Sequence, residues 1–562
     1  MKKTIVILLI ISLTALMIGC KKKQPNIIFF IADDMYPSMF NNIIDSITED
    51  GTPLNLTPAL DRLAREGVWL VNMKVVSPVC TPSRYNCLTG NYASRAINKS
   101  FVNTTKKNEG QPVIQWNSFI VPGKQKTMGT YFQSLGYKTG FVGKNHIIES
   151  LAQVGEKAKP DLDADPRDQK VKEGLEYRYK ELQKDIKKCG FDYADALYHN
   201  NPNWLGIRAL AYHNMDWITE KGLEFIDQNK DHPFMLYIAS TLPHGPTDSN
   251  HSWKADRRIT PRGILDKSPE VLPQYQDKWF PKNEKAKIAE DSGLEPSIRN
   301  LISIRRRIKE NCLEGKGKEN LLWLDDAVSA LFKKLEEEGV IDNTIIVFFN
   351  DHGQELKGTL YEGGINSEAF IWKKGGFKVG NVLKIPVSNV DFLPTLLDLA
   401  GDTKNLNAFD GYSFKAALDD ENYIGRDYMY HELGYVRAIV KDDFKYFSVR
   451  YPKWAMNLTF EQRKKMLEKY NKYKESYGRP IVSTDPLAPF GQLVMIPGGE
   501  LAENPAYTTI PHFTDPDQFY DLKNDPEEMH NLINDPKYTE KIEELKEELR
   551  KEIDKLPGRF DI

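Results

Sequence analysis

The sequence predicts an α/β protein, in which helices cover both faces of one large sheet and a smaller α+β unit follows. Residues 26–32 form a nearly continuous apolar run, which is typical of a strand buried on both faces. Such runs alternate with amphipathic segments up to about residue 400, and this alternation favours a sheet sandwiched by helices. Beyond about residue 420, short alternating runs replace that pattern.

Local signals set the bounds of the predicted helices. Thr57 and Pro58 fit the N-cap and first position of a helix that Gly67 ends. Residues 321–338 form the strongest helical pattern, since aliphatic side chains recur on one face: Leu321, Leu324, Val328, Leu331 and Leu335. The other predicted helices cover residues 126–135, 214–228 and 391–400, and the other predicted strands cover residues 68–76, 140–142, 234–240 and 344–349.

Two stretches interrupt the alternation and divide the chain. Residues 156–188 are charged and contain prolines, and residues 251–318 carry Pro, Arg and Lys with little periodicity. We interpret both as insertions into a main domain that covers residues 21–420. Residues 421–562 then form a C-terminal subdomain, with short strands at 437–440 and 445–449 and a closing helix at 539–556.

Composition excludes several classes of protein. The chain has 562 residues, of which 40% are hydrophobic, so it can bury a sizeable core and is not a disordered chain. Its 76 Lys and Arg against 79 Asp and Glu give a net charge of −3, which gives no support to a nucleic-acid binder. Five cysteines are too few for a disulfide framework in a chain of this length.

The first twenty residues indicate an export signal. Lys2 and Lys3 precede an uncharged run over residues 4–18, which is too short, at about 22 Å, to cross a bilayer. Residues 16–20 resemble a bacterial lipobox, in which Cys20 becomes the lipidated N-terminus of the mature chain. We expect an exported, lipid-anchored protein, facing the periplasm because residues 21–23 are lysines. The alternative is an ordinary signal peptide, in which Cys20 has no role.

Two pairs of possible ligand residues follow predicted strands and indicate a cation site. Asp33 and Asp34 come directly after the strand at 26–32, and Asp351 and His352 follow the strand at 344–349. Ligands of open α/β sheets bind beyond the carboxyl ends of the strands, and carboxylate oxygens suit a hard cation. If the two strands are neighbours, these four side chains meet. The alternative is that each pair only caps a turn.

Cys80 occupies a predicted helix start. Pro82 fits an early helical position, so backbone N–H groups and the helix dipole favour an anion near Cys80. Arg84 lies four residues further on and therefore shares its helix face. By itself this pattern is compatible with a buried thiol or with a nucleophilic cysteine of lowered pKa.

These motifs occur together in one known family. The segment CTPSRYNCLTG (80–90) resembles the signature of type I, formylglycine-dependent sulfatases of the alkaline phosphatase superfamily. The resemblance continues in family order through PNIIFFIADDM (25–35), LGYKTGFVGKNH (135–146), PFMLYIASTLPHGP (233–246) and DNTIIVFFNDHGQELKGTLYEGG (342–364). Two later segments, VSNVDFLPTLLDLAG (387–401) and FYDLKNDPEEMHNL (519–532), extend it to about residue 535. It implies an alkaline phosphatase-like fold with a large mixed sheet.

The resemblance implies a modified nucleophile and a metal. In this family a maturating enzyme oxidises the motif cysteine, here Cys80, to Cα-formylglycine. One hydroxyl of the hydrated aldehyde attacks sulfur and displaces the alcohol, and the other loses its proton and expels sulfate. The implied cation ligands are Asp33, Asp34, Asp351, His352 and the oxygen of residue 80. The family metal is calcium, although the ligands also allow magnesium.

The resemblance also assigns roles to further side chains. Lys144 and Lys357 match the two sulfate-binding lysines, and Arg84 would hold the oxyanion of residue 80. His244 matches the histidine that protonates the leaving oxygen, and His146 the one that assists aldehyde regeneration. We expect Lys144 and His146, two apart on an extended segment, to point to one side. The chain departs from the family pattern at Asn145, where Trp is commoner, and at Gln354, where Glu is frequent.

The expected substrate is a sulfated polysaccharide or oligosaccharide, because an exported enzyme meets material from the environment. Candidates for binding the sugar are His199, Asn200, His431 and Arg437, each of which could instead be an ordinary loop residue. Two other functions stay open. Relatives with the same nucleophile motif act on phosphorus, as phosphodiesterases or phosphonate hydrolases, and an inactive relative would be a lipoprotein that binds anionic glycans.

Overall fold

The computed structural model describes residues 24–39, 57–150, 163–246, 255–269, 271, 318–476 and 511–562, with short pieces between 478 and 510. A sheet of eight strands in the order β11-β2-β10-β9-β1-β6-β4-β5 forms its centre. These strands are β1 Asn26–Asp33, β2 Val68–Leu70, β4 Lys138–Lys144, β5 Tyr193–Tyr198, β6 Phe234–Pro243, β9 Thr344–Asn350, β10 Ala369–Lys373 and β11 Val382–Leu383. The sheet is mixed, as the sequence predicts.

The most apolar strands lie at the middle of this sheet. Strand β1 runs parallel to β9 on one side and to β6 on the other, with Ala32 opposite Asn350 and Phe30 opposite Ile238. Strand β4 continues the parallel set beyond β6, and β10 runs antiparallel to β9. All eight residues of β1 and all seven of β9 are buried. The carboxyl ends of β9, β1, β6 and β4 therefore meet at one edge.

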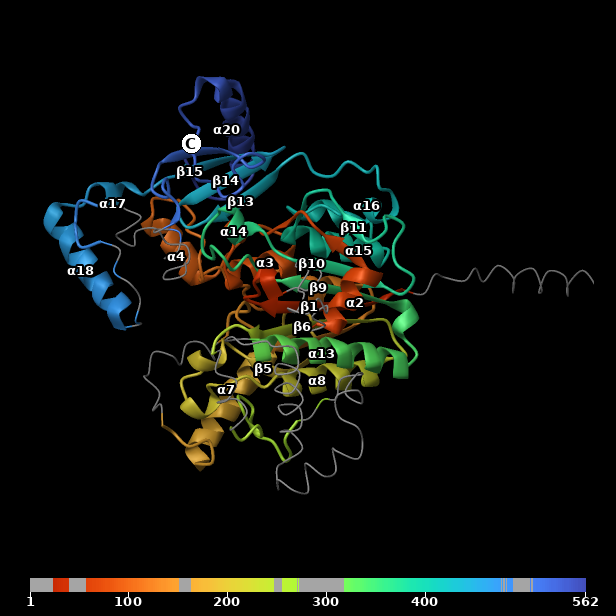
Figure 1. The fold of residues 1–562 in the computed structure, drawn as a ribbon. Helices are drawn as coiled ribbons and strands as arrows, with labels where there is room; N and C mark the ends of the chain where they lie inside the picture. The colour runs from red at the N-terminus through yellow and green to blue at the C-terminus, as the bar shows by residue number, and fades with distance from the viewer. Residues whose placement is uncertain are drawn as a thin grey trace, which may run out of the picture.

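Helices cover both faces of the sheet (Figure 1). Helices α8 (Met215–Asn229) and α13 (Lys318–Glu337) pack together on one face, and α3 (Cys80–Thr89) and α15 (Phe392–Leu399) lie on the other. Helix α8 begins where the Asn214 side chain accepts a hydrogen bond from the backbone of Trp217. The other long helices of this domain are α2 Pro58–Glu66, α4 Lys99–Lys107, α5 Met128–Ser134 and α7 Gln169–Lys187.

A second, antiparallel sheet forms the centre of the C-terminal subdomain. Its order is β13-β14-β15-β16, with bounds Met429–Leu433, Val436–Lys441, Phe444–Val449 and Asp517–Asp521. Helix α20 (Thr539–Ile553) packs on β14 and β15, and Figure 1 shows this unit above the large sheet. The described part of this region also contains helices α17 (Lys453–Met456) and α18 (Phe460–Ser476). The predicted strands and closing helix are confirmed.

One predicted strand is wrong. Residues 68–76 form two short strands, because the chain leaves the large sheet after β2 and pairs β3 (Met73–Lys74) with β12 (Val387–Ser388). The segment predicted to be an insertion, residues 156–188, contains α7, which packs on β5 and buries Leu175, Tyr179, Leu182 and Ile186. Charged residues between these positions obscure that apolar spacing in the sequence, and the insertion itself stays a prediction.

The two other predicted segments lie mostly outside the described residues. Residues 1–20, with Cys20, are not among them, and of 251–318 the structure describes only 255–269, 271 and the first turn residue of α13. Residues 255–269 contain the small hairpin of β7 (Ile259–Thr260) and β8 (Gly263–Ile264). The lipid anchor therefore stays a prediction.

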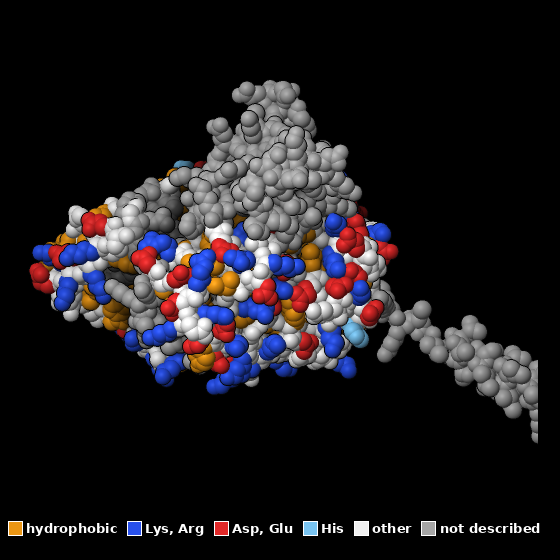
Figure 2. Space-filling view, turned by 90° about the horizontal axis from the view of Figure 1, so that it is seen from below, with side chains coloured by type: hydrophobic (Ala, Val, Ile, Leu, Met, Phe, Trp, Pro, Cys, Tyr) orange, Lys and Arg blue, Asp and Glu red, His pale blue; other side chains and the backbone are white. Residues whose placement is uncertain are grey.

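The surface on the side of α8 and α13 carries charges of both signs. Lys334 of α13 lies 3.4 Å from Asp227 of α8, and Lys230 lies 2.6 Å from Glu338. Figure 2 shows Lys and Arg interspersed with Asp and Glu over the described part of this face. Among the described helices, none has the length and apolar character needed to span a bilayer.

The close approach of β4 to β6 requires glycine at position 143. Gly143 has φ +96°, and a Cβ there would lie 1.9 Å from the Ala239 carbonyl oxygen. We expect Gly143→Ala to lower Tm strongly, because a left-handed backbone costs about 1–2 kcal/mol for an L-residue before the overlap is counted. Gly174→Ala is the matched control, since its Cβ would meet nothing within 4 Å inside α7. It should raise stability by about 1 kcal/mol; equal effects would contradict the reasoning.

Candidate active site

The predicted site residues converge at the carboxyl edge of the parallel strands. Asp33 ends β1 and Asp34 follows it, Asp351 and His352 follow β9, and Lys144 ends β4. His244 follows β6 in the same way. Parallel pairing of β1 with β9 places Asp33 and Asp34 beside Asp351 and His352, as the sequence predicts if the strands are neighbours.

A buried asparagine braces the two acidic loops. Oδ1 of Asn350 accepts a hydrogen bond from the backbone of Met35 at 2.9 Å, and its Nδ2 donates to the carbonyls of Met35 and His352 at 3.0 and 2.7 Å. The backbone N–H of Asp34, at φ +67°, donates to Oδ1 of Asp351 at 3.2 Å. The carboxylates are thus held by both strands and not by flexible loops.

Cys80 is the first residue of α3, with its thiol at the centre of the cluster. Its Sγ lies 3.6 Å from Oδ1 of Asp33, 3.5 Å from Nε2 of His352 and 3.7 Å from Nζ of Lys357. All ten residues of α3 are buried, and the Ser83 hydroxyl fixes this helix by donating to the Asp351 carbonyl. The start of α3 therefore places residue 80 beside the side chains that could bind a metal.

Arg84 shares the helix face of Cys80 and is fully buried. Its Nη2 lies 3.4 Å from Oδ1 of Asp33 and 3.3 Å from Oδ2 of Asp351. Burial alone would lower the pKa of Arg84, but these two carboxylates raise it, so the guanidinium stays charged. Its Nε and Nη1 have no hydrogen-bond partner among the described residues, which leaves N–H groups available to an anion.

Two lysines complete the positive side of the site. Nζ of Lys144 lies 2.6 Å from Oδ2 of Asp33, and Nζ of Lys357 lies 2.6 Å from Oδ1 of Asp34. Burial would lower the pKa of Lys357, but Asp34 raises it above the usual lysine value. For Asp33 and Asp34, burial raises the pKa, but Lys144 and Arg84 beside Asp33 and Lys357 beside Asp34 lower it well below the usual range. Both carboxylates are therefore ionised near neutral pH.

The donor atoms fit a hard divalent cation. Two groups of ligand atoms each lie within 4.8 Å of one another: Asp34, Cys80 and His352 in one group, and Asp33, Cys80 and Asp351 in the other. Nδ1 of His352 lies 3.0 Å from the Gly353 carbonyl, so Nε2 faces the carboxylates. Burial would lower the pKa of His352, but Asp351 and the hydrogen bonds with Asp34 and Cys80 raise it to about 10. Three carboxylates with an imidazole nitrogen form an oxygen-rich ligand set.

The two other histidines border this cluster. Nε2 of His244 lies 3.3 Å from Oδ2 of Asp34, and burial lowers the pKa of His244 although Asp34 and Asp33 oppose the shift. Burial and the cations Lys144 and Arg84 lower the pKa of His146 well below its usual value. The extended geometry expected at His146 is wrong, because its φ is +43° in a turn beyond β4. Asn145 braces that turn through hydrogen bonds with the backbone of Ile148.

The structure brings only part of the expected sugar-binding set toward the site. His199 and Asn200 are half-buried on the loop after β5, whose backbone pairs with that of His146. Nδ2 of the next residue, Asn201, lies 2.9 Å from Nε2 of His244. Sequence reasoning missed Asn201, because asparagine in a loop is common and its partner lies 43 residues away.

The predictions for His431 and Arg437 are wrong. Arg437 is 2% exposed, and its guanidinium donates to the carbonyls of Gly434, Val436 and Pro112. The His431 side chain is fully buried, and its Nδ1 lies 2.8 Å from the Val75 carbonyl. Burial lowers the pKa of His431 to about 3, so the ring is neutral. Both residues stabilise the contact between the C-terminal sheet and the main domain.

A buried ion cluster supports the segment that carries Lys357. Five residues beyond Lys357, Glu362 lies 2.8 Å from Nζ of Lys445 and also pairs with Lys74. Lys445 in turn lies 2.6 Å from Glu528. Glu528 accepts from the backbone N–H of Glu362 at 2.6 Å. Lys445 and Glu528 of the C-terminal subdomain thus bind Glu362, which belongs to the segment of the main domain that carries Lys357.

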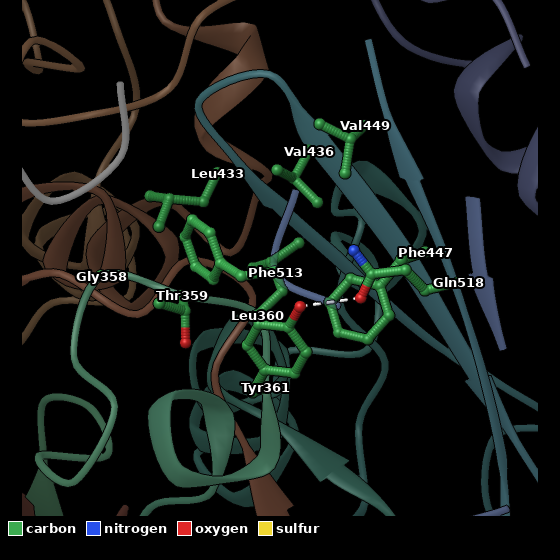
Figure 3. A pocket seen from close by; sticks show the side chains of 10 residues that line it. All are labelled: Gly358, Thr359, Leu360, Tyr361, Leu433, Val436, Phe447, Val449, Phe513 and Gln518. Carbon is green, nitrogen blue, oxygen red and sulfur yellow. Dashed lines mark hydrogen bonds between the residues drawn. The ribbon is translucent and has the colours of Figure 1, made fainter. Parts of the chain in front are cut away.

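An apolar pocket lies between the same segment and the C-terminal sheet. Figure 3 shows residues 358–361 on one side of it and Leu433, Val436 and Phe447 on the other. Its volume is about 380 Å³ including space open to solvent. The Tyr361 hydroxyl, turned toward Gln518, makes a hydrogen bond of 2.7 Å to its Oε1. None of its described lining side chains is charged, so this pocket contributes packing and not the chemistry of the site.

Comparison with known proteins places the chain in a family. The model of the Sulfatase family matches residues 25–402, and the chain belongs to that family. An extracellular sulfatase SULF-1 homolog of Drosophila melanogaster is 25% identical over 426 residues, which cover 73% of this chain and 32% of that protein. An N-acetylglucosamine-6-sulfatase of Capra hircus is 26% identical over 417 residues, covering 70% and 64%. The chain thus spans less than two thirds of the length of these relatives.

Solved structures show the same alkaline phosphatase-like fold. One solved structure shows a protein in complex with its substrate, D-glucosamine-2-N,6-O-disulfate. Its alignment with this chain has a TM-score of 0.52 at 20% identity and covers 95% of this chain and 98% of that chain. A phosphonate monoester hydrolase from Silicibacter pomeroyi has a TM-score of 0.51 at 17% identity, covering 96% and 99%. At these identities the likeness establishes the fold and not the substrate.

The buried ion cluster gives a prediction for stability. Lys445→Met leaves Glu528 without its buried cation and leaves Glu362 with Lys74 alone, so we expect it to lower the free energy of unfolding by about 3–5 kcal/mol. The control Lys551→Met breaks an exposed pair with Glu548 and should cost less than about 1 kcal/mol. Thermal and urea denaturation measure both variants. A loss for Lys445→Met no larger than that of the control would contradict the cluster's role.

Proposed function

We propose that this protein is a sulfuric ester hydrolase that removes sulfate from a sulfated carbohydrate, using Cys80 matured to Cα-formylglycine. The observation that carries this proposal is the position of residue 80. It lies at the buried start of α3. Its Sγ is within 3.7 Å of the Asp33 carboxylate, the His352 imidazole and the Lys357 ammonium group. A maturating enzyme would act before or during folding, because Cys80 is 1% exposed in the folded chain.

The residues of this chain can divide the reaction among them. Arg84, Lys144 and Lys357 supply three positive charges around residue 80, which would bind the anionic sulfate ester and the charge that develops on it. His244 is the side chain suited to protonate the leaving oxygen, and His146, neutral through its lowered pKa, is suited to accept a proton during aldehyde regeneration.

Asp33, Asp34, Asp351 and His352 would hold a divalent cation, for which we propose calcium. A cation bound there supplies Lewis-acid chemistry toward the oxygen carried by residue 80. The four ligands are set by the ends of β1 and β9, so the two strands fix the position of the charge. Magnesium is the alternative metal.

A carbohydrate substrate follows from the relatives' names. One relative is an N-acetylglucosamine-6-sulfatase, and a fold neighbour was solved with a sulfated glucosamine. The second candidate function is hydrolysis of phosphonate or phosphate diesters, because a phosphonate monoester hydrolase shares the fold. Rates on 4-nitrophenyl sulfate and on bis-4-nitrophenyl phosphate separate the two candidates.

The nucleophile assignment predicts a chemical modification. Peptide mass spectrometry of active protein should show the Cys80 peptide in its aldehyde form, and Cys80→Ala should abolish turnover of 4-nitrophenyl sulfate because no nucleophile remains. Cys87→Ala is the matched control, since Cys87 is a second buried thiol of the same helix. Full activity of Cys80→Ala would show that another group attacks sulfur.

The cation site predicts a thermal shift that does not depend on maturation. Calcium added to chelator-treated protein should raise Tm, because a ligand that binds only the folded state stabilises it. Asp351→Asn should lose most of this shift, whereas Asp398→Asn, which pairs with Lys415 away from the ligand groups, should keep it. If the Asp351→Asn protein responds to calcium as the wild type does, these residues do not bind the metal.

A further inference from the structure

Helices α17 and α18 form an arm on one side of the molecule, beyond α4 (Figure 1). The arm has a small core of its own, in which Leu467 of α18 packs against Ala455 of α17. Trp454 of α17 connects it to the body, because its Nε1 donates to Oδ1 of Asn108 at 3.0 Å, and Asn108 directly follows α4. The arm is thus fixed at its base, and the opposite face of α18 is exposed.

The exposed face of α18 is basic. The helix carries six Lys and Arg against three Glu. Lys465, Lys469 and Lys472 follow one another at intervals of four and three residues, which places them on one stripe of the helix, and all three are exposed. At 1.5 Å per residue the stripe is about 10 Å long. An extended anionic chain can therefore contact all three ammonium groups at once.

These lysines have no carboxylate partner within the described part of the chain. A Glu stands four positions before Lys465 and another before Lys472, the spacing at which ion pairs commonly form on a helix, yet neither lysine makes an ion pair with a described residue. In α20, by contrast, Lys546 and Lys551 each pair with the Glu three residues before it. The ammonium groups of the stripe are therefore available to an anion from outside the chain.

The basic surface continues across α17 to the end of α4. Lys453 of α17 and Lys106 and Lys107 in the last turn of α4 are exposed and make no ion pair with a described residue. Two aromatic side chains lie on the same arm: Trp454 is 40% exposed, and Phe460, the first residue of α18, is 50% exposed. This combination suits a sulfated sugar chain, because ammonium groups bind its sulfates and aromatic rings pack on the apolar faces of its sugar rings.

One segment of the chain connects the base of the arm with the active site. Residues 108–120 run from the end of α4 to Ile120, whose backbone N–H donates to the Ile147 carbonyl at 3.0 Å. Ile147 directly follows His146. In Figure 1, α4 lies between the arm and α3, the helix that begins with the proposed nucleophile. The arm and the site are thus neighbouring parts of the molecule that a long chain, but not a single sugar, can contact together.

We propose that α17 and α18 bind a sulfated polysaccharide outside the active site and hold it while sulfate is removed from it. The inference rests on the proposed function and adds that the substrate is polymeric. A lipid surface fits the arm less well, because an interfacial helix needs an exposed apolar face, whereas Leu467 and Tyr470 on the apolar side of α18 are buried. A nucleic acid is disfavoured by the net charge of −3 of the whole chain.

The experiment measures binding of the full chain to dextran sulfate, with neutral dextran and phosphatidylglycerol vesicles as the other probes. The wild type should bind dextran sulfate more tightly than vesicles at the same concentration of charge, and should not bind neutral dextran. The triple variant Lys465→Gln, Lys469→Gln, Lys472→Gln keeps good helix formers on the exposed face and should bind dextran sulfate about tenfold more weakly. The slope of log Kd against log salt should fall by about 2, at about 0.7 counterions for each lost contact, as in single-stranded nucleic acids.

A second triple variant controls for the change in net charge. Lys546→Gln, Lys551→Gln and Lys555→Gln together remove the same charge from α20, where each lysine already has a Glu partner. Binding of dextran sulfate by this variant should stay within about twofold of the wild type, since paired surface charges contribute little. In matured enzyme, the α18 variant should lose kcat/KM on a sulfated polysaccharide by the same factor as it loses affinity, and should turn over 4-nitrophenyl sulfate as the wild type does.

Equal binding of dextran sulfate by the two triple variants would overturn the inference, and so would tighter binding of the wild type to the vesicles than to dextran sulfate. An equal loss of the α18 variant on the polysaccharide and on 4-nitrophenyl sulfate would also count against it, because it would show a general defect. Wild-type protein that hydrolyses no sulfate ester would instead overturn the proposed function. Binding is measured without turnover, so these failures are distinguishable.

Discussion

The compensation of buried charge at one edge of the sheet determines the rest of the site. Asp33 and Asp351 are fully buried and Asp34 nearly so, and their charges lie beside the Arg84 guanidinium and the Lys144 and Lys357 ammonium groups. Isolated charges would be very costly in such surroundings, whereas paired charges are tolerated. The same cations that stabilise the buried carboxylates are placed to bind an anionic ester. The charges that stabilise the fold at this edge are therefore also those that would bind the substrate.

This arrangement depends on elements far apart in the sequence. Strands β1 and β9 contribute the carboxylates, β4 and the loop after β9 contribute the lysines, and α3 brings residue 80 with Arg84. The C-terminal sheet supports the Lys357 segment through Lys445 and Glu528, which are themselves buried. A change in the subdomain can therefore reach the site through a few charged contacts.

Much of the site could be predicted from the sequence because its residues follow buried strands or begin a helix. Asp33, Asp34, Asp351 and Cys80 each stand at an element boundary that local signals mark. The residues that could not be assigned correctly lie in loops or in the C-terminal sheet. Arg437 and Asn201 are typical: an arginine near a cleft and an asparagine in a loop have no local pattern that separates binding, packing and positioning.

The sequence alone determined the α/β class, the central strands and the ordered motifs of the sulfatase family, because apolar spacing and helix-start chemistry are local properties. Only the tertiary structure decided that β1 and β9 are neighbours and that α7 buries its apolar face. It also decided that the Arg437 guanidinium donates its hydrogen bonds to backbone carbonyls. It also decided that Asn201 meets His244 across 43 residues. Contacts of this kind depend on which strand ends lie side by side, and that is set by the packing of the whole sheet.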